Sequence, residues 1–309
     1  MNAICTELLS KTYPNGNIGV QNLSFCVQEG EIVGLLGPNG AGKTTTVNLL
    51  STVFPPTKGT ASILGYDIVK QKNQIRAIIG VVSQEYALDW ALSVYDHLMI
   101  FAEIRGLRPK EANQRIDLLL NQFDLTGKHR SRLLNLSGGQ IRRVQLIRAL
   151  LFEPKILFVD EPTLELDPKG VKITLGLLRE FAQSGTTIVL ASNAMAIVEE
   201  LCDRVIFLRN GTILDQGPTY QFLSKYGGAQ TVEFRYEGEV TDVMINSVCR
   251  ENSWSVLSRT PLRVMGDDYS EIIWQVIPVL RSSGILIREI KVEKPSLETV
   301  FLQLSAGES

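Results

Sequence analysis

The stretch "GLLGPNGAGKTTT", residues Gly34–Thr46, ends an apolar run and opens a glycine-rich loop. Residues Gly37–Thr44 fit the pattern G-x-x-x-x-G-K-[ST], which cradles phosphates when a strand precedes it and a helix follows. Its glycines let backbone N–H groups point inward, and the helix N-terminus adds partial positive charge. We therefore call Gly37–Thr44 the phosphate loop. Lys43 is expected to reach the β- and γ-phosphates and Thr44 to bind Mg²⁺.

Three apolar runs predict the sheet around this loop. Glu31–Gly37, Lys155–Asp160 and Thr186–Ser192 are short and nearly continuous, which is typical of buried parallel strands. Each run precedes a helical pattern, so an α/β domain with a parallel sheet is expected. The pair Asn210-Gly211 between two further apolar runs predicts a type I′ hairpin.

The spacing of apolar residues divides the chain further. Residues from Val94 to Leu151 show mostly helical periodicity, so a helical insert at about 90–151 is expected. We place a nucleotide-binding domain at 1–224, a linker at 225–230 and a small α+β domain at 231–309. The last domain reads as βαββαβ, the order of ferredoxin-like domains. It shows no catalytic constellation, which favours a regulatory or interface role.

Composition narrows the class of protein. The 309 residues carry a formal net charge of -2, so nucleic acid is not expected as a main partner. The N-terminus lacks a signal-peptide pattern, and no apolar run approaches the roughly 20 residues that span a bilayer. We expect a cytoplasmic protein whose membrane role comes through a partner. The four cysteines are expected to be free thiols in a reducing compartment: Cys5, Cys26, Cys202 and Cys249.

Two carboxylates follow the second apolar run, in "ILFVDEP". Asp160 ends the predicted strand, where a carboxylate can hold Mg²⁺ through water. Glu161 follows it and is placed to polarise an attacking water as a general base. The alternative is an ordinary acidic pair at a strand end.

The pentapeptide "LSGGQ", Leu136–Gln140, decides between kinds of ATPase. It precedes a helical run and stands just ahead of the Asp160 strand, so it forms a second anion site at a helix N-terminus. In the order strand, phosphate loop, helical insert, "LSGGQ" and "FVDEP", it is very specific. Over residues 1–224 the chain resembles the nucleotide-binding subunit of ABC transporters. We call Leu136–Gln140 the signature motif.

The resemblance implies an ABC-type P-loop fold, with a parallel-sheet core, an antiparallel β subdomain and the helical insert. It implies ATP hydrolysis with Mg²⁺, held by Thr44, Gln84 and Asp160. Tyr13 resembles the aromatic residue that stacks on adenine, although it can also be a plain surface tyrosine. Gln84 resembles a glutamine that senses Mg²⁺ and the attacking water, although it can also be a polar loop residue. The residues expected at the nucleotide are Tyr13, Gly37, Asn39, Gly40, Gly42, Lys43, Thr44 and Thr45.

The resemblance also implies partners. ATP in this family lies between the phosphate loop of one subunit and the signature motif of another, so a second ATP-binding subunit, of the same or a different chain, is expected. The residues that would act across this dimer are Ser137, Gly138, Gly139 and Gln140, with Asp167 in the interface loop. The aromatics Tyr86 and Trp90 resemble the region that grips a membrane subunit, or they are core residues of the insert.

The tail "VEKPSLETVFLQLS", Val292–Ser305, resembles that of drug- and polysaccharide-export ATPases. It favours an exporter with separate membrane-spanning permease subunits. The chain would then lie peripherally on the cytoplasmic face of a membrane. The sequence does not identify the cargo, which membrane subunits would select.

Two positions depart from the family pattern. Asn193 stands where the family has a histidine that contacts the γ-phosphate. An asparagine donates only as a neutral group, so hydrolysis slowed by roughly 5–30-fold is expected. Alternatively, Asn193 merely caps a helix beginning near Ala194. Glu165 stands where the family usually has glycine, and its carboxylate would repel ATP unless it points away or meets a cation.

Three functional readings remain. The first is an active but slowed catalytic subunit of an exporter, with Glu161, Gln84 and Asn193 as its catalytic residues. The second is one half of an asymmetric heterodimer, a nucleotide-gated module with little turnover of its own. The third is a soluble ABC-superfamily ATPase without a transport role.

Overall fold

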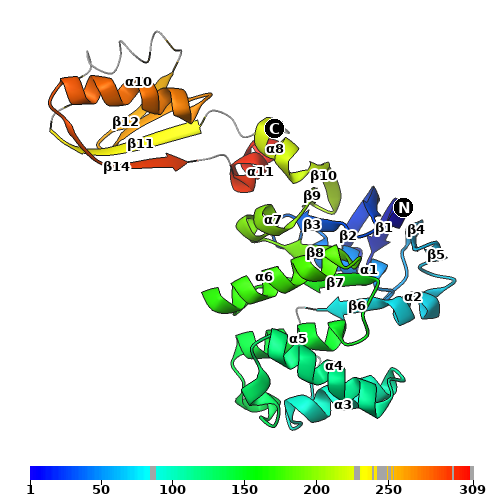
Figure 1. Cartoon of the computed structure of the whole chain (residues 1–309). Helices are drawn as coiled ribbons and strands as arrows, with labels where there is room; N and C mark the ends of the chain where they lie inside the picture. Colours follow the sequence, from blue (N-terminus) through cyan, green and yellow to red (C-terminus); the bar gives the residue numbers. More distant parts are fainter. Residues whose placement is uncertain are drawn as a thin grey trace. The chain divides into compact units, whose positions relative to one another are not determined.

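A six-stranded sheet of order β10-β9-β3-β8-β7-β6 forms the centre of the first part of the chain (Figure 1). The neighbouring pairs from β9 to β6 are parallel, and β10 is antiparallel to β9. The strands are β3 (Ile32–Leu36), β6 (Ile79–Val82), β7 (Ile156–Asp160), β8 (Thr187–Ser192), β9 (Arg204–Arg209) and β10 (Thr212–Pro218). This computed structural model describes residues 1–83, 88–225, 230–238, 240–241, 249, 252, 254–293 and 296–306.

The burial of the strands explains their apolar sequences. Every residue of β3, β7 and β8 is buried, because both faces of the sheet are covered. The three predicted strands are therefore confirmed. Asn210 and Gly211 have φ of 50° and 78°, the two positive values that a type I′ turn requires, so the predicted hairpin is confirmed as β9–β10.

A second, antiparallel sheet of order β2-β1-β4-β5 packs into the same core. Its strands are β1 (Asn2–Thr12), β2 (Ile18–Gln28), β4 (Lys58–Ile63) and β5 (Tyr66–Asp67). Cys5 lies opposite Cys26 in the β1–β2 register, with a Cα–Cα separation of 4.2 Å, and the two form a disulfide. The expectation of four free thiols was wrong for this pair, because strand pairing joins residues 21 positions apart. Cys202 and Cys249 are buried and form no disulfide within the described part of the chain.

The helices of the first part fall into two groups. Those that flank the central sheet are α1 (Lys43–Leu50), α2 (Lys72–Ile78), α6 (Pro168–Gln183) and α7 (Met195–Leu201). The helical insert consists of α3 (Val94–Ile104), α4 (Pro109–Gln122), α5 (Gly138–Leu150) and the 3-10 turns Thr126–Lys128 and Leu133–Asn135. Figure 1 shows α3, α4 and α5 together beyond β6. The signature motif therefore leads into a helix of the insert, as predicted.

The chain divides into two units, Met1–Pro218 and Thr219–Ser309. The division falls before helix α8 (Thr219–Lys225), whereas the sequence suggested a linker at 225–230. The physical reason is that α8 contacts α11 (Leu297–Ala306), which belongs to the second unit.

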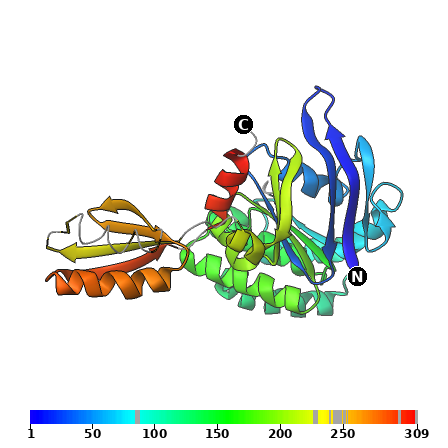
Figure 2. The same ribbon diagram turned by 90° about the horizontal axis from the view of Figure 1, so that it is seen from above.

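The second unit contains a four-stranded antiparallel sheet of order β12-β13-β11-β14. Its strands are β11 (Gln230–Glu237), β12 (Ser255–Arg259), β13 (Leu262–Gly266) and β14 (Leu286–Glu293). Helix α10 (Tyr269–Ser282) runs along one face of this sheet (Figure 2). The first helix of the predicted βαββαβ order, at 241–252, lies mostly outside the described residues.

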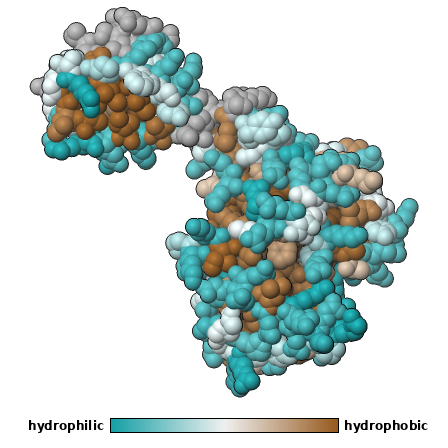
Figure 3. All heavy atoms as spheres, in the orientation of Figure 1, coloured by the Kyte–Doolittle hydropathy of each residue, from teal (hydrophilic) through white to brown (hydrophobic). Residues whose placement is uncertain are grey.

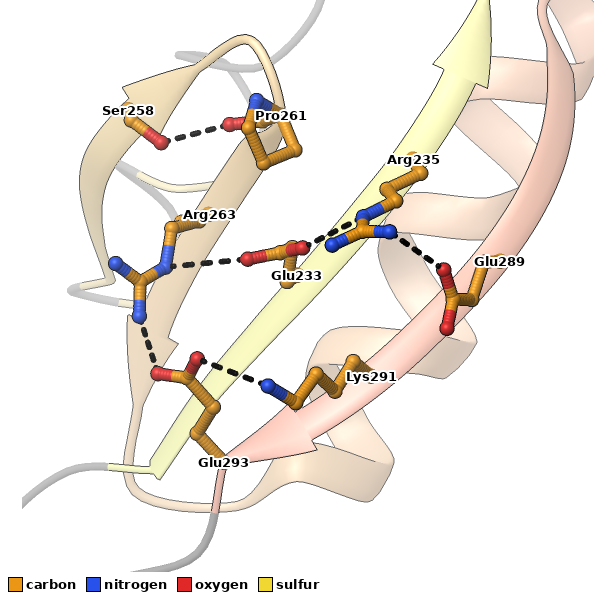
Figure 4. A network of polar contacts seen from close by, with 8 residues as sticks. All are labelled: Glu233, Arg235, Ser258, Pro261, Arg263, Glu289, Lys291 and Glu293. Carbon is orange, nitrogen blue, oxygen red and sulfur yellow. Dashed lines mark hydrogen bonds and ion pairs between the residues drawn. The ribbon is translucent and has the colours of Figure 1, made fainter.

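The two faces of this sheet differ in chemistry. Val232 and Phe234 on β11 point into the apolar core, while Glu233 between them points to the other face. There Glu233 pairs with Arg235 at 3.0 Å and with Arg263 at 3.7 Å (Figure 4). The pair with Arg263 joins β11 to β13, and a cross-strand ion pair of this kind stabilises a sheet modestly.

Within the described ranges, none of the helices has both the length and the apolar character needed to cross a bilayer.

Candidate functional site

The phosphate loop joins β3 to α1 and is closed by its own lysine. Gly42 has φ of 105°, and a Cβ there would lie 2.7 Å from the carbonyl oxygen of Gly19. Only glycine therefore lets the loop pass so close to the neighbouring strand. The ammonium of Lys43 donates to the carbonyl oxygens of Gly37 at 2.7 Å and Pro38 at 3.1 Å. The lysine thus lies across the mouth of the loop.

Asp160 faces the loop from the end of β7. The Thr44 hydroxyl donates to its carboxylate at 2.8 Å, although 116 residues separate the two in sequence. Burial raises the pKa of Asp160 above its ordinary value, and Thr44, Arg142 and Lys43 act in the opposite direction. Burial also lowers the pKa of Lys43, which the charges of Glu161 and Asp160 partly offset. A hydroxyl and a carboxylate oxygen in contact are the hard donors that suit Mg²⁺, so the residues fit that ion.

Glu161 directly follows β7, and residues at the end of the neighbouring strand β8 hold it. It has φ of 52°, a left-handed conformation that is rare for a residue with a side chain, and its N–H donates to the Ala191 carbonyl oxygen at 2.8 Å. The Ser192 hydroxyl and the backbone N–H of Asn193 each donate to its carboxylate at 2.9 Å. The side-chain direction of Glu161 is therefore fixed by the neighbouring strand.

Asn193 supports this carboxylate through its main chain, while its side chain is exposed and lines the site. The alternative that Asn193 caps a helix was wrong. Helix α7 begins at Met195, and its N-cap is Ala194, which has no side chain able to cap. The N–H of Ala194 donates instead to the Ser192 hydroxyl at 3.0 Å. The asparagine amide is thus available to a ligand in the cavity.

These groups surround one cavity of about 370 Å³. Nine predicted residues line it, together with Gly19 and Leu164, which the sequence did not suggest. The predicted ones are Asn39, Gly40, Gly42, Lys43, Thr44, Thr45, Asp160, Glu161 and Asn193. Tyr13 lies near this loop, with its hydroxyl 3.0 Å from the Thr45 hydroxyl, and Gly37 contributes the carbonyl that Lys43 binds.

Three further candidates precede the insert or lie at its start, and the structure describes one of them. Gln84, expected to sense Mg²⁺ and water, lies outside the described residues, as does Tyr86. Trp90 is 41% exposed, so its ring is not a core residue of the insert.

The signature motif caps the N-terminus of α5 through hydrogen bonds between its own residues. The Ser137 hydroxyl accepts from the Gln140 N–H at 3.3 Å, and the Gln140 side chain accepts from the Ser137 N–H at 3.1 Å. Glu165 lies against this end of the helix, because a Cβ on Gly138 would be only 1.6 Å from its carboxylate. The departure from glycine therefore places an acid directly over the signature glycines. Asp167 nearby caps α6 by accepting from the Gly170 N–H at 2.9 Å.

Sequence reasoning missed Arg142, which is 1% exposed and reaches the backbone of Asp160 and Glu161. A signal was present, because Arg142 shares a helix face with Leu146 and Ala149, at spacings of four and seven residues. Neither histidine takes the place of Asn193. His97 is buried in α3, and His129 stacks on Tyr95 in the insert.

Comparison with known sequences gives a consistent picture. A family model described as "ABC transporter" matches residues 20–164. The linearmycin resistance ATP-binding protein LnrL of Bacillus subtilis is 30% identical over 302 residues, covering 97% of this chain and 97% of that protein. The doxorubicin resistance ATP-binding protein DrrA of Mycobacterium tuberculosis is 31% identical over 309 residues, covering 98% and 93%. The Nod factor export ATP-binding protein I of Rhizobium leguminosarum bv. viciae is 33% identical over 303 residues, covering 97% and 94%.

Solved structures agree with the fold of the first unit. One, an ATP-binding subunit of an ABC transporter, superposes with a TM-score of 0.67 at 29% identity, covering 73% of this chain and 93% of that chain. A dimeric ATP-binding cassette in a post-hydrolysis state, bound to ADP and Pi, superposes with a TM-score of 0.66 at 26% identity, covering 70% and 98%.

Proposed function

The chain belongs to the family of ABC transporter ATP-binding proteins and is an ATPase, and from that premise we propose that it powers an exporter through separate membrane-spanning subunits. The observation that carries the catalytic part is the cavity that brings Lys43, at the start of α1, together with Asp160 and Glu161, at the end of β7. Export is supported by the resemblance, over nearly the whole chain, to resistance and Nod factor export proteins.

Each side chain around the cavity has a task in this proposal. The loop amides and Lys43 bind the β- and γ-phosphates of ATP. Glu161 accepts the proton of the attacking water, or orients that water, because its carboxylate is fixed beside the loop. Thr44, Asp160 and Gln84 would hold Mg²⁺, which when bound neutralises charge on the phosphates. Because burial raises the pKa of Asp160, this carboxylate should be protonated, and its hold on Mg²⁺ weakened, at a higher pH than for an ordinary aspartate.

The signature motif would act on ATP held by a second ATP-binding subunit. Three of its residues lie at a helix N-terminus, which favours an anion: Ser137, Gly138 and Gly139. None of the three lines the phosphate-loop cavity of this chain. ATP would then close a dimer of two subunits, and hydrolysis would reopen it and move the permease subunits. The chain would lie peripherally on the cytoplasmic face of the membrane.

Asn193 sets the expected speed of hydrolysis. Its side chain lines the cavity but offers only a neutral donor where the family has histidine, so turnover would be slowed. The second candidate, a nucleotide-gated half of an asymmetric heterodimer, is favoured by Glu165 over the signature motif. The fixed carboxylate of Glu161 favours the active enzyme.

We propose that the second unit is an interface or regulatory domain. Figure 3 shows apolar atoms gathered on one part of this unit. Its exposed large apolar side chains include Leu257, Trp274 and Leu286. A contiguous apolar area on a small domain is typical of a contact surface.

The test measures phosphate release from ATP by the full chain and by Glu161→Gln. We expect turnover to fall at least roughly 100-fold, with ATP binding retained, because the amide cannot accept the proton. Equal turnover in the two proteins would refute the role of Glu161. Purification from the native membrane should bring down a membrane-spanning subunit; recovery with only soluble partners would favour a non-transport ATPase.

A further inference from the structure

Arg142 is a buried cation that connects the signature helix to the catalytic strand end. It lies in the second turn of α5, four residues after Gly138, and is 1% exposed. A fully buried guanidinium is costly unless its donors are satisfied. Its surroundings therefore indicate what it holds in place.

The guanidinium binds backbone oxygens from two other segments. One terminal nitrogen donates to the Ser83 carbonyl oxygen at 2.7 Å and to the Gln145 side chain at 2.9 Å. The other terminal nitrogen donates to the carbonyl oxygens of Asp160 and of Glu161, the latter at 2.8 Å. Ser83 directly precedes Gln84 in sequence. One side chain thus contacts the backbone beside three residues assigned to ATP hydrolysis.

The two bonds at the strand end determine where the Glu161 side chain points. The Asp160 carbonyl belongs to the peptide group before the Glu161 Cα atom, and the Glu161 carbonyl belongs to the peptide group after it. Fixing both groups fixes φ and ψ of Glu161, and so the direction of its Cα–Cβ bond. That conformation has φ of 52° and persists only where surrounding contacts impose it. Ser192 and the Asn193 N–H then hold the carboxylate itself.

We propose that Arg142 is a positioning residue for Glu161: its guanidinium holds the left-handed turn that aims this carboxylate, and it ties that turn to the signature helix. The proposal rests on the function proposed above for Glu161. An arginine suits the task because its planar fork presents several donors in fixed directions and keeps its charge. A displacement of α5, when the signature motif meets a nucleotide, would be carried to the strand end through this side chain.

The chain offers a matched control in the next residue. Arg143 lies on the same helix and donates to the Phe123 carbonyl oxygen at 2.9 Å, within the insert and away from the cavity. Arg142→Gln, Arg142→Lys and Arg143→Gln are compared in the full chain, with thermal unfolding recorded for each. Arg142→Lys keeps a buried cation and serves where Arg142→Gln does not fold.

We expect both Arg142 variants to lower kcat by roughly 10- to 100-fold, because a small displacement of a catalytic group has effects of that size. The affinity for ATP, measured directly with a fluorescent analogue, should change by less than about 3-fold, because the phosphate loop is untouched. Arg143→Gln should keep kcat within about 3-fold of the wild type. A loss of ATP affinity that matches the loss of kcat, or an equal loss in Arg143→Gln, would overturn the proposal.

A double variant separates positioning from general support of the fold. If Arg142 acts through Glu161, Arg142→Lys should slow single-turnover hydrolysis little further in a Glu161→Gln background. If the double variant is slower by the product of the two single-variant factors, the two side chains act independently and the proposal is contradicted. If Glu161→Gln hydrolyses ATP as fast as the wild type, the role of Glu161 itself fails. If Glu161→Gln is inactive while Arg142→Lys is fully active, only the inference about Arg142 fails.

Discussion

The phosphate loop and the signature motif are two helix N-termini of one chain, and they differ in what faces them. The N-terminus of α1 opens on a cavity whose walls include Lys43 and the hydrogen-bonded pair of Thr44 and Asp160. The N-terminus of α5 has the carboxylate of Glu165 against it. Both ends favour an anion, but only the first is arranged to take it from solution. A helix N-terminus therefore does not define a nucleotide site; the groups around it do.

Of the residues that face the two helix N-termini, Asn193 on the phosphate side is expected to give the largest change short of inactivation. Asn193→His should raise ATP turnover by roughly 5- to 30-fold, because a protonated imidazole gives the γ-phosphate a charge-assisted bond. Steady-state phosphate release from the full chain measures it. Asn193→Ala is the control, since it keeps the backbone N–H that donates a hydrogen bond to the Glu161 carboxylate. Unchanged turnover in Asn193→His would show that this side chain does not meet phosphate.

A smaller effect is expected at Glu165, on the signature side. Its carboxylate competes with phosphate for the N-terminus of α5, so Glu165→Gly should lower the ATP concentration for half-maximal turnover by roughly 2- to 10-fold. Glu165→Gln separates charge from backbone strain, because φ at this residue is 62° and glycine relieves that strain too. If neither variant shifts the ATP dependence, Glu165 does not compete with the nucleotide.

The smallest effect concerns the stability of the insert that carries the signature helix. Burial, with a lesser contribution from Arg148, lowers the pKa of His97 to about 4. Below about pH 6.5, His97 takes up a proton in the unfolded chain but stays neutral in the folded chain. The free energy of unfolding should therefore fall by roughly 2 kcal/mol between pH 6.5 and pH 4. Denaturant titrations at several pH values measure this slope.

A matched pair of variants checks the assignment to His97. His97→Leu cannot titrate and should flatten the slope. His129→Gln removes the other histidine of the chain and is the matched control. Equal slopes in the wild type and in His97→Leu would show that another group is responsible.

The sequence predicted the phosphate side better than the signature side, and the reason is physical. Lys43, Thr44 and the strand before them are adjacent in sequence, so a local pattern describes them. The family order of motifs then led to Asp160 and Glu161, and the ABC-type fold is confirmed by similar structures. The roles of individual site residues stay predictions.

What the sequence missed depends on contacts between distant segments. Arg142 reads as a polar residue of a helix, but tertiary packing turns it inward to the end of β7. The same applies to Ser192, whose hydroxyl holds Glu161, and to the Cys5–Cys26 disulfide across two strands. A periodic pattern shows which face of an element is buried, but not which backbone carbonyl that face contacts.

ATP binding and turnover, compared in Lys43→Ala and Gly138→Asp, test whether the two helix ends serve different nucleotides. Lys43→Ala should lose ATP binding by at least roughly 10-fold, since the phosphates lose a charged partner. Gly138→Asp should bind ATP within about 2-fold of the wild type yet turn over at least roughly 100-fold more slowly, because the added charge repels phosphate across the dimer. Loss of ATP binding in Gly138→Asp to the same degree as in Lys43→Ala would show that the two helix ends serve the same nucleotide.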